Sequence, residues 1–252
     1  MQKHFSGHIA DLKHLWHTVF GDAPSVIDAY FDIFYSPDRT ACEFVDGELA
    51  AAAYVMPAGE LTAGDTKEKC AHIYAVAVYP KFRGRGLGIS VTNRAVQLAK
   101  ENGFNTVVLH PASDSLFDYY KKHCGFETCF YSKTETMPLG AVNEASLCTD
   151  INSYITCREK FLSSIPHISL NEEILTFFVN CGGKLYASDF GCAAVEVSDG
   201  TAYFREALGD VSSICPEDAE NASLSLVGCD IPTGMIHGSA EFKFGWMGLT
   251  LA

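Results

Sequence analysis

The sequence predicts a mixed α/β protein in which a glycine-rich loop joins a buried strand directly to a helix. Three observations predict this class. An apolar run covers residues 73–78, three glycines follow within 84–88, and apolar residues then recur at helical spacing over 87–98. A strand, a helix and a further strand follow Gly103, so strands and helices alternate. Open sheets of this kind usually bind ligands beside their strand ends.

Each element of this first half has its own local signal. The first two segments have apolar residues at helical spacing, and 21–22 (Gly-Asp) separates them. The Asp-Gly pair at 46–47 is a strong signal for a tight hairpin turn, whereas the polar segment 60–69 is expected to be a loop. In order, the expected elements are helices at 9–20 and 23–34, strands at 41–45, 48–56 and 73–78, a helix that begins at 87 and ends at Gly103, a strand at 105–110, a helix at 113–123 and a strand at 127–135.

The 252 residues are enough for two domains with their own cores. We expect a first domain over 1–137, a linker over 138–150 and a second, smaller, strand-rich α+β domain over 151–252. The second domain opens with a helical segment at 151–162, followed by strands at 183–188, 193–197 and 201–208. Its Asp-Gly turn at 199–200 repeats the one at 46–47. Two explanations stay open, a degenerate copy of the first domain and an unrelated small α+β lid.

Composition and charge exclude several classes of protein. The chain is 48% hydrophobic and 19% charged, and no apolar run approaches the roughly 18 residues of a membrane span, so we expect an ordered, soluble protein. The first residues lack the pattern of a secretory signal, and the ten cysteines form no C-x-x-C pair, so we expect a cytoplasmic protein with buried, reduced thiols. A net charge of −13 argues against a nucleic-acid partner and weakly favours a cationic substrate.

The glycine-rich loop after the buried strand is the most informative feature of the chain. Its glycines let successive main-chain amides approach a phosphate, and the helix that follows adds unpaired N–H groups and a positive dipole end. A dinucleotide fingerprint would need glycine where Ile89 or Val91 stands, and no Gly-Lys-Ser or Gly-Lys-Thr of a P-loop occurs. What remains is R-x-x-G-x-G, filled by Arg83, Gly86 and Gly88. We expect this loop to hold a diphosphate, the alternative being an ordinary tight turn.

This R-x-x-G-x-G loop resembles the coenzyme A signature of the GNAT superfamily of N-acetyltransferases, and the element order over 1–137 resembles a complete GNAT domain. The segment 15–22, Leu-Trp-x-x-x-Phe-Gly-Asp, and the long C-terminal extension are similar to the multidomain bacterial group that includes the Eis-type acetyltransferases. The resemblance implies acetyl-CoA as co-substrate. It implies coenzyme-binding roles for Val76, Ala77 and Val78 at the pantetheine arm and thioester, and for Arg83, Gly84, Arg85, Gly86, Leu87 and Gly88 at the diphosphate.

The catalytic residues follow the family pattern less closely. Many members place a glutamate base where this chain has His72, and a neutral imidazole can also accept a proton, although a structural histidine is the alternative. Members commonly use a tyrosine acid four residues before a Gly-Phe pair. That pair is present at 125–126, but the fourth residue back is Lys121. One extra residue at the helix end would restore Tyr120 to the acid position, with Tyr119 as the alternative.

Metal chemistry has little support in the sequence. His4 and His8, and likewise His14 and His17, have spacings that place both members of the pair on one helix face. Neither pair has a cysteine or carboxylate at ligand spacing, so we expect no metal site.

We therefore expect an acetyl-CoA-dependent N-acetyltransferase that transfers the acetyl group to a primary amine by direct attack. The acceptor, a small molecule or a peptide, is not legible in the sequence. The oligomeric state is also open, a homodimer included. The alternative is a catalytically inactive, coenzyme-A-binding regulatory or scaffold protein, because the glutamate is missing and the tyrosine is shifted.

Overall fold

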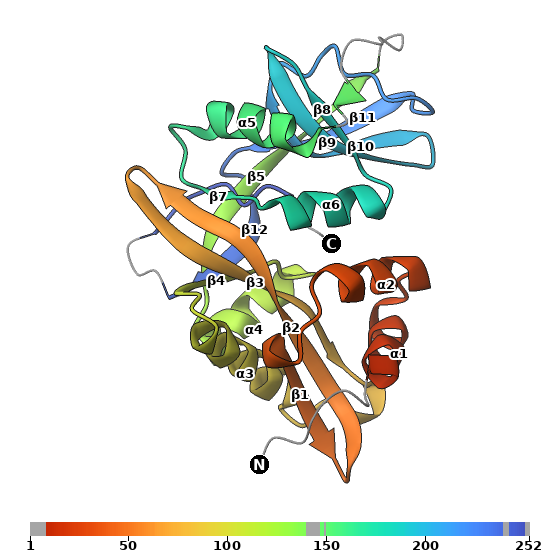
Figure 1. The fold of residues 1–252 in the computed structure, drawn as a ribbon, viewed down its shortest axis with the longest axis vertical. Helices are drawn as coiled ribbons and strands as arrows, with labels where there is room; N and C mark the ends of the chain where they lie inside the picture. Colours follow the sequence, from red (N-terminus) through yellow and green to blue (C-terminus); the bar gives the residue numbers. More distant parts are fainter. Residues whose placement is uncertain (1–8, 140–146, 149, 239–241, 250–252) are drawn as a thin grey trace. The chain divides into compact units, whose positions relative to one another are not determined.

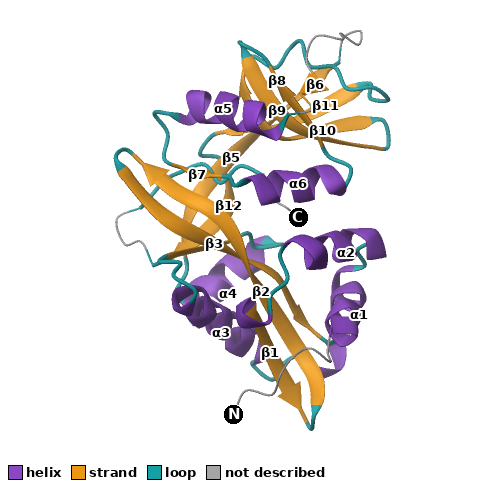
Figure 2. Ribbon diagram, in the orientation of Figure 1, coloured by secondary structure: helices purple, strands orange, loops and turns teal. Residues whose placement is uncertain are grey.

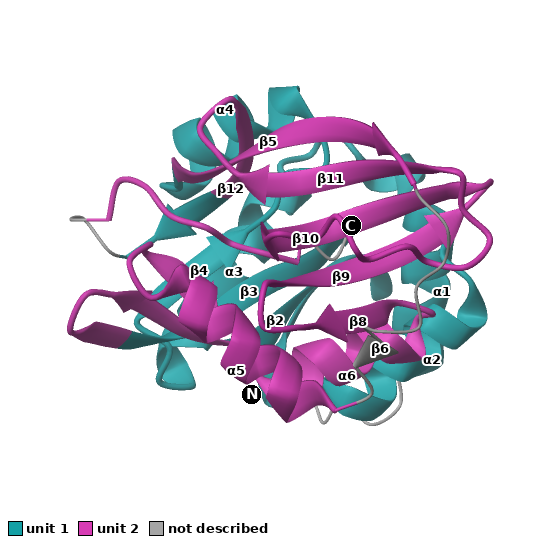
Figure 3. Ribbon diagram, turned by 90° about the horizontal axis from the view of Figure 1, so that it is seen from above, with its two compact units in different colours: residues 1–58, 68–127, 235–240 teal, residues 59–67, 128–234, 241–252 magenta. Residues whose placement is uncertain are grey.

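The computed structural model describes residues 9–139, 147–148, 150–238 and 242–249. The chain forms two compact units, and each is assembled from three chain segments (Figure 3). Unit 1 consists of Met1–Ala58, Glu68–Glu127 and Met235–Ala240, and unit 2 of Gly59–Lys67, Thr128–Gly234 and Glu241–Ala252. The division of the sequence into 1–137, 138–150 and 151–252 stays a prediction, because the compact units are not contiguous segments.

Unit 1 contains a mixed sheet with helices, which confirms the predicted α/β class (Figure 1). Its helices are α1 (Ile9–Phe20), α2 (Pro24–Ile33), α3 (Leu87–Glu101) and α4 (Asp114–Cys124), and its strands are β1 (Thr40–Val45), β2 (Glu48–Ala63), β3 (Thr66–Val78) and β4 (Thr106–Leu109). The strands follow the order β1-β2-β3-β4. β1 and β2 are antiparallel, whereas β3 and β4 are parallel and are joined through α3. This crossover places the glycine loop at the end of β3.

The two faces of this sheet are covered differently (Figure 2). On one face, small residues of β2 such as Ala51 and Ala53 form a core with Val91 and Ala95 of α3 and with the buried side of α4. The other face packs against α1 and α2 through aromatic rings. The Trp16 ring there lies 4.9 Å from that of Tyr30 and 5.2 Å from that of Tyr54, and these contacts follow from the alternation of side chains along β2.

The predicted loop over 60–69 is wrong, because β2 continues to Ala63 and β3 already begins at Thr66. A tight turn joins them, and Gly64 in this turn has a left-handed φ of 58°. Next to the turn, β2 pairs with the short strand β7 (His167–Ser169) in unit 2. The segment looks like a loop in the sequence because many of its side chains are polar, whereas here they occupy exposed or half-buried strand positions.

Unit 2 is the strand-rich part of the chain. In chain order it contains β5 (Glu127–Pro138), β6 (Leu147–Cys148), α5 (Ile151–Leu162), β7, α6 (Glu172–Asn180), β8 (Lys184–Ala187), β9 (Gly191–Ser198), β10 (Thr201–Gly209), β11 (Asn221–Val227) and most of β12 (Ile231–His237). Its strands follow the order β5-β11-β10-β9-β8-β6. β8, β9 and β10 are antiparallel neighbours, whereas β10 and β11 are parallel.

The order of elements in unit 2 parallels that of unit 1. In both, two helices precede three sequential strands, and the third strand pairs in parallel with a fourth. The third strand is irregular in both, since Ala75 in β3 has a φ of 46° and β10 shifts register between Phe204 and Glu206. Residues 210–220, which replace α3, contain no helix and are all described. This order favours a degenerate copy over an unrelated lid, and the assignment stays a prediction.

The strand that completes the sheet of unit 1 comes from the C-terminal part of the chain. The expected closing strand at 127–135 exists as β5, but β5 pairs with β11 in unit 2. In unit 1, β4 instead pairs with the last residues of β12, where Met235 lies opposite Leu109 and His237 opposite Val107. Unit 1 therefore combines segments that are far apart in the sequence.

A buried ion pair lies in the core of unit 2. Arg158 of α5 and Glu206 of β10 have no exposed surface. The Arg158 Nε donates to Glu206 Oε1 at 2.7 Å, and Tyr154 Oη and Trp246 Nε1 donate to the same carboxylate at 2.8 and 2.6 Å. Arg158 also donates to the Ile168 carbonyl oxygen at 2.9 Å. Burial of two charges is costly, so their partners must all be in place.

We expect Glu206→Ala to lower the free energy of unfolding of the full chain by about 3–5 kcal/mol, because the buried guanidinium of Arg158 then keeps only the partly exposed Glu159, at 3.1 Å, as a carboxylate partner. Glu196→Ala is the matched control, because Glu196 pairs with Arg205 at 2.6 Å with about a third of each side chain exposed. We expect it to cost about 0–1 kcal/mol. Denaturant titration measures both values, and equal losses would contradict the structural role of the buried pair.

Candidate active site

The loop between β3 and α3 has the backbone that its glycines permit. Gly84 and Gly86 have φ values of 78° and 76°, in the left-handed region that side chains rarely adopt. Gly86 is the residue that precedes α3, and the first hydrogen bond of the helix runs from the Ser90 N–H to the Gly86 carbonyl oxygen at 3.1 Å. The N–H groups of residues 87–89 precede this bond, so they have no acceptor within the helix. Unpaired N–H groups at the start of a helix are suited to binding an anion.

A cavity of about 420 Å³ lies at this end of α3, within unit 1. It is lined by Val19, Val76, Val78, Phe82, Arg83, Gly84, Gly86, Leu87, Gly88, Ile89, Leu116, Tyr119 and Tyr120. The structure thus brings most of the predicted coenzyme-binding residues together with the predicted acid. Three predicted residues, Ala77, Arg85 and His72, are not among those that line it. Ala77 is buried, and the Arg85 guanidinium lies 5.5 Å from the centre of the Phe82 ring.

β3 and β4 separate just before the cavity. Their recorded parallel pairing runs from Cys70 opposite Thr106 to His72 opposite Val108. Beyond it, β3 carries the strained φ of Ala75, while Leu109 of β4 pairs with β12. The main-chain groups of residues 76–78 thus lie outside this ladder and next to the cavity. The role of residues 76–78 at the pantetheine arm stays a prediction, and no sequence pattern marked the irregularity at Ala75.

Arg83 fixes the exit of β3. Its Nε donates to the carbonyl oxygen of Val78 at 3.3 Å, across a short helical turn over Pro80–Phe82. Nearby, the Lys81 ammonium forms an exposed salt bridge with Glu48. Arg83, the first residue of the R-x-x-G-x-G pattern, therefore ties the loop to the end of β3 through this hydrogen bond. It also lines the cavity.

Tyr120 lies at the back of the cavity and is buried, with 8% of its surface exposed. Burial raises its pKa, and the neighbouring Tyr119 and Cys124 raise it further, so the phenol keeps its proton at neutral pH. The last turn of α4 is wider than a regular turn, because the N–H groups of Gly125 and Phe126 both donate to the Tyr120 carbonyl oxygen. This turn accommodates the extra residue that the shifted sequence register suggested.

His72 is buried on the α1/α2 face of β3, with 4% exposed, and its ring meets that of Tyr74 at 5.7 Å. Burial, together with His110, lowers its pKa to about 3. An imidazole with so low a pKa stays neutral at physiological pH and is a weak base. Its role as a base stays a prediction, and this environment does not support it.

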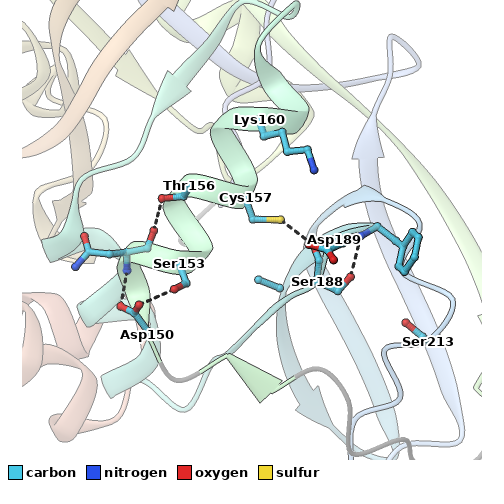
Figure 4. A pocket seen from close by; sticks show the side chains of 11 residues that line it. Asp150, Ser153, Thr156, Cys157, Lys160, Ser188, Asp189 and Ser213 are labelled. Carbon is cyan, nitrogen blue, oxygen red and sulfur yellow. Dashed lines mark hydrogen bonds between the residues drawn. The ribbon is translucent and has the colours of Figure 1, made fainter.

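A larger cavity, of about 950 Å³, lies in unit 2 (Figure 4). One wall is the face of α5 that carries Ser153, Cys157 and Lys160, and the other is the turn between β8 and β9 with Asp189. Its backbone groups are occupied locally, since Ser188 Oγ accepts from the Gly191 N–H at 3.2 Å. No glycine-rich loop leads into a helix at this site. Chemistry, and not volume, therefore selects the smaller cavity as the candidate active site.

Other features of the sequence have plain outcomes. His4 and His8 lie outside the described residues, while His17 Nδ1 contacts the Asp22 carbonyl oxygen at 2.9 Å and the His14 ring lies 6.1 Å from that of Tyr79. Within the described part of the chain, no group of three or more metal-ligating side chains is found. The described cysteine side chains are all free thiols. Five of them are buried as expected, whereas those at 42, 157 and 181 are half-buried and the one at 229 is exposed. No described helix is both long and apolar enough to cross a membrane.

The fold and the cavity define a class of protein: an α/β domain in which unpaired amides at the start of a helix line a cavity beside the end of a strand. Residues 5–129 match the family model described as an acetyltransferase (GNAT) domain. This part of the chain belongs to the GNAT acetyltransferase family, as the sequence predicted.

Comparison with individual proteins gives similar fold but limited sequence overlap. A probable glucosamine 6-phosphate N-acetyltransferase 2 from Oryza sativa subsp. japonica is 45% identical over 58 residues, which cover 23% of this chain and 34% of that protein. A GCN5-related N-acetyltransferase from Kribbella flavida has a TM-score of 0.70 at 15% identity, over 91% of this chain and 68% of that one. Eis1 from Mycobacterium abscessus has a TM-score of 0.57 at 12% identity, over 89% and 64%. These two structures show a shared fold, and membership of the Eis-type group stays a prediction.

The buried state of His72 predicts a specific pH dependence. Its folded pKa of about 3 lies below the ordinary value of 6.5, so between these pH values the unfolded chain binds a proton that the folded chain does not. Stability from this residue is therefore lost as the pH falls below about 6.5, with a slope approaching about 1.4 kcal/mol per pH unit.

Denaturant titrations at several pH values between 7 and 5 measure this slope. His72→Gln should make the slope shallower than in the unchanged protein. If His72→Gln keeps the original slope, the histidine is not held neutral by burial.

Proposed function

We propose that this chain is an acetyl-CoA-dependent N-acetyltransferase that transfers an acetyl group to a primary amine by direct attack. The observation that carries the proposal is the cavity in which the amides at the start of α3, the end of β3 and the buried Tyr120 converge. The membership of residues 5–129 in the GNAT family supports it. The match to the rice protein covers about a third of that protein's length. The activity of the whole protein is therefore part of the proposal.

The residues of the cavity suit coenzyme A. In this proposal the diphosphate binds the N–H groups of 84–88 and the first turn of α3, where glycine leaves the main chain accessible. The pantetheine arm lies along residues 76–78, with the thioester carbonyl near main-chain donors of this segment. Val76 and Val78 contribute cavity wall, and the buried Ala77 supports them from the opposite face of the strand.

The reaction moves one acetyl group and one proton. The lone pair of the neutral amine attacks the thioester carbonyl, a C–N bond forms, and the C–S bond breaks as the tetrahedral intermediate collapses. The departing thiolate takes the proton of Tyr120, the amine nitrogen loses a proton to solvent or to a base, and Tyr120 regains a proton from solvent, so the net change moves one proton from the amine to the thiol. A phenol of raised pKa is a reluctant acid toward an ordinary thiolate, but burial raises the basicity of the thiolate as well.

A primary amine is the acceptor in this proposal, on a small molecule or a peptide. The similar rice protein is described as a probable glucosamine 6-phosphate N-acetyltransferase, so glucosamine 6-phosphate is one amine to test. The net charge of −13 favours a cationic acceptor through long-range attraction. The cytoplasmic location expected from the sequence is part of this proposal. The oligomeric state stays open, a homodimer included.

A second candidate is a coenzyme-A-binding protein without turnover. The observation that favours it is the lining of the cavity, which includes no aspartate, glutamate or histidine, while His72 is a buried weak base. Release of coenzyme A from acetyl-CoA with a panel of primary amines separates the two candidates. Tight coenzyme binding without amine-dependent release would favour the second.

The loop glycines provide a test of coenzyme binding. Gly86→Ala forces a left-handed φ onto a side chain at the start of α3, and Gly103→Ala does the same beyond the other end of the helix, both in open space. We expect both to cost similar stability, about 1–2 kcal/mol. Calorimetry should show a loss of coenzyme A affinity of about tenfold or more for Gly86→Ala alone, and equal losses for the two variants would contradict the assigned diphosphate site.

Tyr120→Phe tests the acid. The hydroxyl is removed while the ring still packs against Phe126, whose ring lies 6.2 Å away. We expect kcat to fall about 10²–10³-fold at pH 7, with the Kd for acetyl-CoA changed less than about threefold. Tyr203→Phe, in an exposed part of β10, is the control. Chromatographic measurement of released coenzyme A gives kcat, and an unchanged kcat for Tyr120→Phe would remove this residue from the mechanism.

A further inference from the structure

Tyr119 is held against the first turn of α3 in an unusual way. A Cβ atom added to Gly88 would lie 2.8 Å from the Tyr119 hydroxyl oxygen, which is closer than real Cβ contacts come. Gly88 is not among the glycines with positive φ, so its backbone conformation does not require glycine. A side chain at this position would therefore require the tyrosine hydroxyl to shift. The hydroxyl therefore lies beside the main chain that precedes the hydrogen bonds of the helix.

The hydroxyl of Tyr119 is free to meet a ligand at this place. The residue is half-buried and lines the 420 Å³ cavity, and no hydrogen bond from its hydroxyl is found among the described residues. Its ring is fixed by edge contacts with Tyr120 at 5.3 Å and by His123 at 5.5 Å. Partial burial, followed by Cys124, raises its pKa, so it carries its proton. A protonated phenol beside the helix N-terminal amides can donate a hydrogen bond to an anion that binds there.

We propose that Tyr119 is a diphosphate-binding residue whose hydroxyl donates a hydrogen bond to an oxygen of the coenzyme diphosphate held at the start of α3. This inference rests on the proposed function and adds a residue to it. The two adjacent tyrosines then have separate roles. Tyr120, deeper in the core, serves the sulfur, and Tyr119 serves the phosphate end. In this proposal, glycine at position 88 leaves room for the Tyr119 hydroxyl beside the first turn of α3.

Tyr119→Phe tests this assignment by calorimetry with coenzyme A, ADP and pantetheine. Loss of one hydrogen bond to a charged oxygen is expected to weaken coenzyme A and ADP about ten- to hundredfold and to leave pantetheine, which lacks the diphosphate, within about twofold. Tyr35→Phe, which removes a hydroxyl just after α2 outside the cavity, is the matched control and should bind all three probes as the unchanged protein does.

A double-variant cycle supplies an independent readout. Gly88→Ala places its methyl group against the Tyr119 hydroxyl, so it should lower coenzyme A affinity more in the unchanged background than in the Tyr119→Phe background, where that contact is relieved. Thermal unfolding confirms that each variant is folded before binding is compared.

The outcomes are distinct. Normal coenzyme A and ADP affinity in Tyr119→Phe, with the unchanged protein binding both, would overturn this inference and leave the proposed function standing. Equal losses for all three probes would also overturn it, because the hydroxyl would then act on the whole cavity. Failure of the unchanged protein to bind coenzyme A at all would overturn the proposed function and this inference with it.

Discussion

The structure of the candidate site depends on a few main-chain N–H groups that α3 cannot use itself. The helix begins at Leu87, directly after two left-handed glycines, and its first hydrogen bond is made by Ser90. β3 brings the chain to this point, and α4 closes the other side through Tyr119 and Tyr120. Everything proposed for catalysis follows from this arrangement, because a coenzyme anchored there by its diphosphate would extend along the end of β3 toward the buried phenol.

Unit 2 has a similar order of elements but no helix in the place of α3. Residues 210–220 connect β10 to the parallel strand β11 directly, so no helix N-terminus follows the irregular strand. The carboxylate of Glu206, within the irregular part of β10, is saturated by Arg158, Tyr154 and Trp246. A buried and fully partnered ion pair stabilises a core, but it leaves no donor for a ligand. Within the described residues, the glycine-rich loop that leads into a helix is thus a feature of unit 1.

Local signals in the sequence were enough to predict the parts of the site that are contiguous in the chain. The loop from Arg83 to Gly88, the helix after it and the Asp-Gly hairpin at 46–47 follow from glycine, turn and periodicity rules. Non-local features could not be predicted. The pairing of β12 with β4, the burial of His72 and the packing of Tyr119 on Gly88 depend on tertiary contacts between distant segments. The polar strand ends around 60–69 misled the prediction because exposed strands and loops share their composition.

A crystal structure of the full chain with coenzyme A tests the central claim most directly. The account predicts diphosphate oxygens within about 3 Å of the N–H groups of residues 87–89, with the thiol end beside residues 76–78 and directed toward Tyr120. A coenzyme bound in the 950 Å³ cavity of unit 2, or one whose diphosphate contacts no amide at the start of α3, would contradict it.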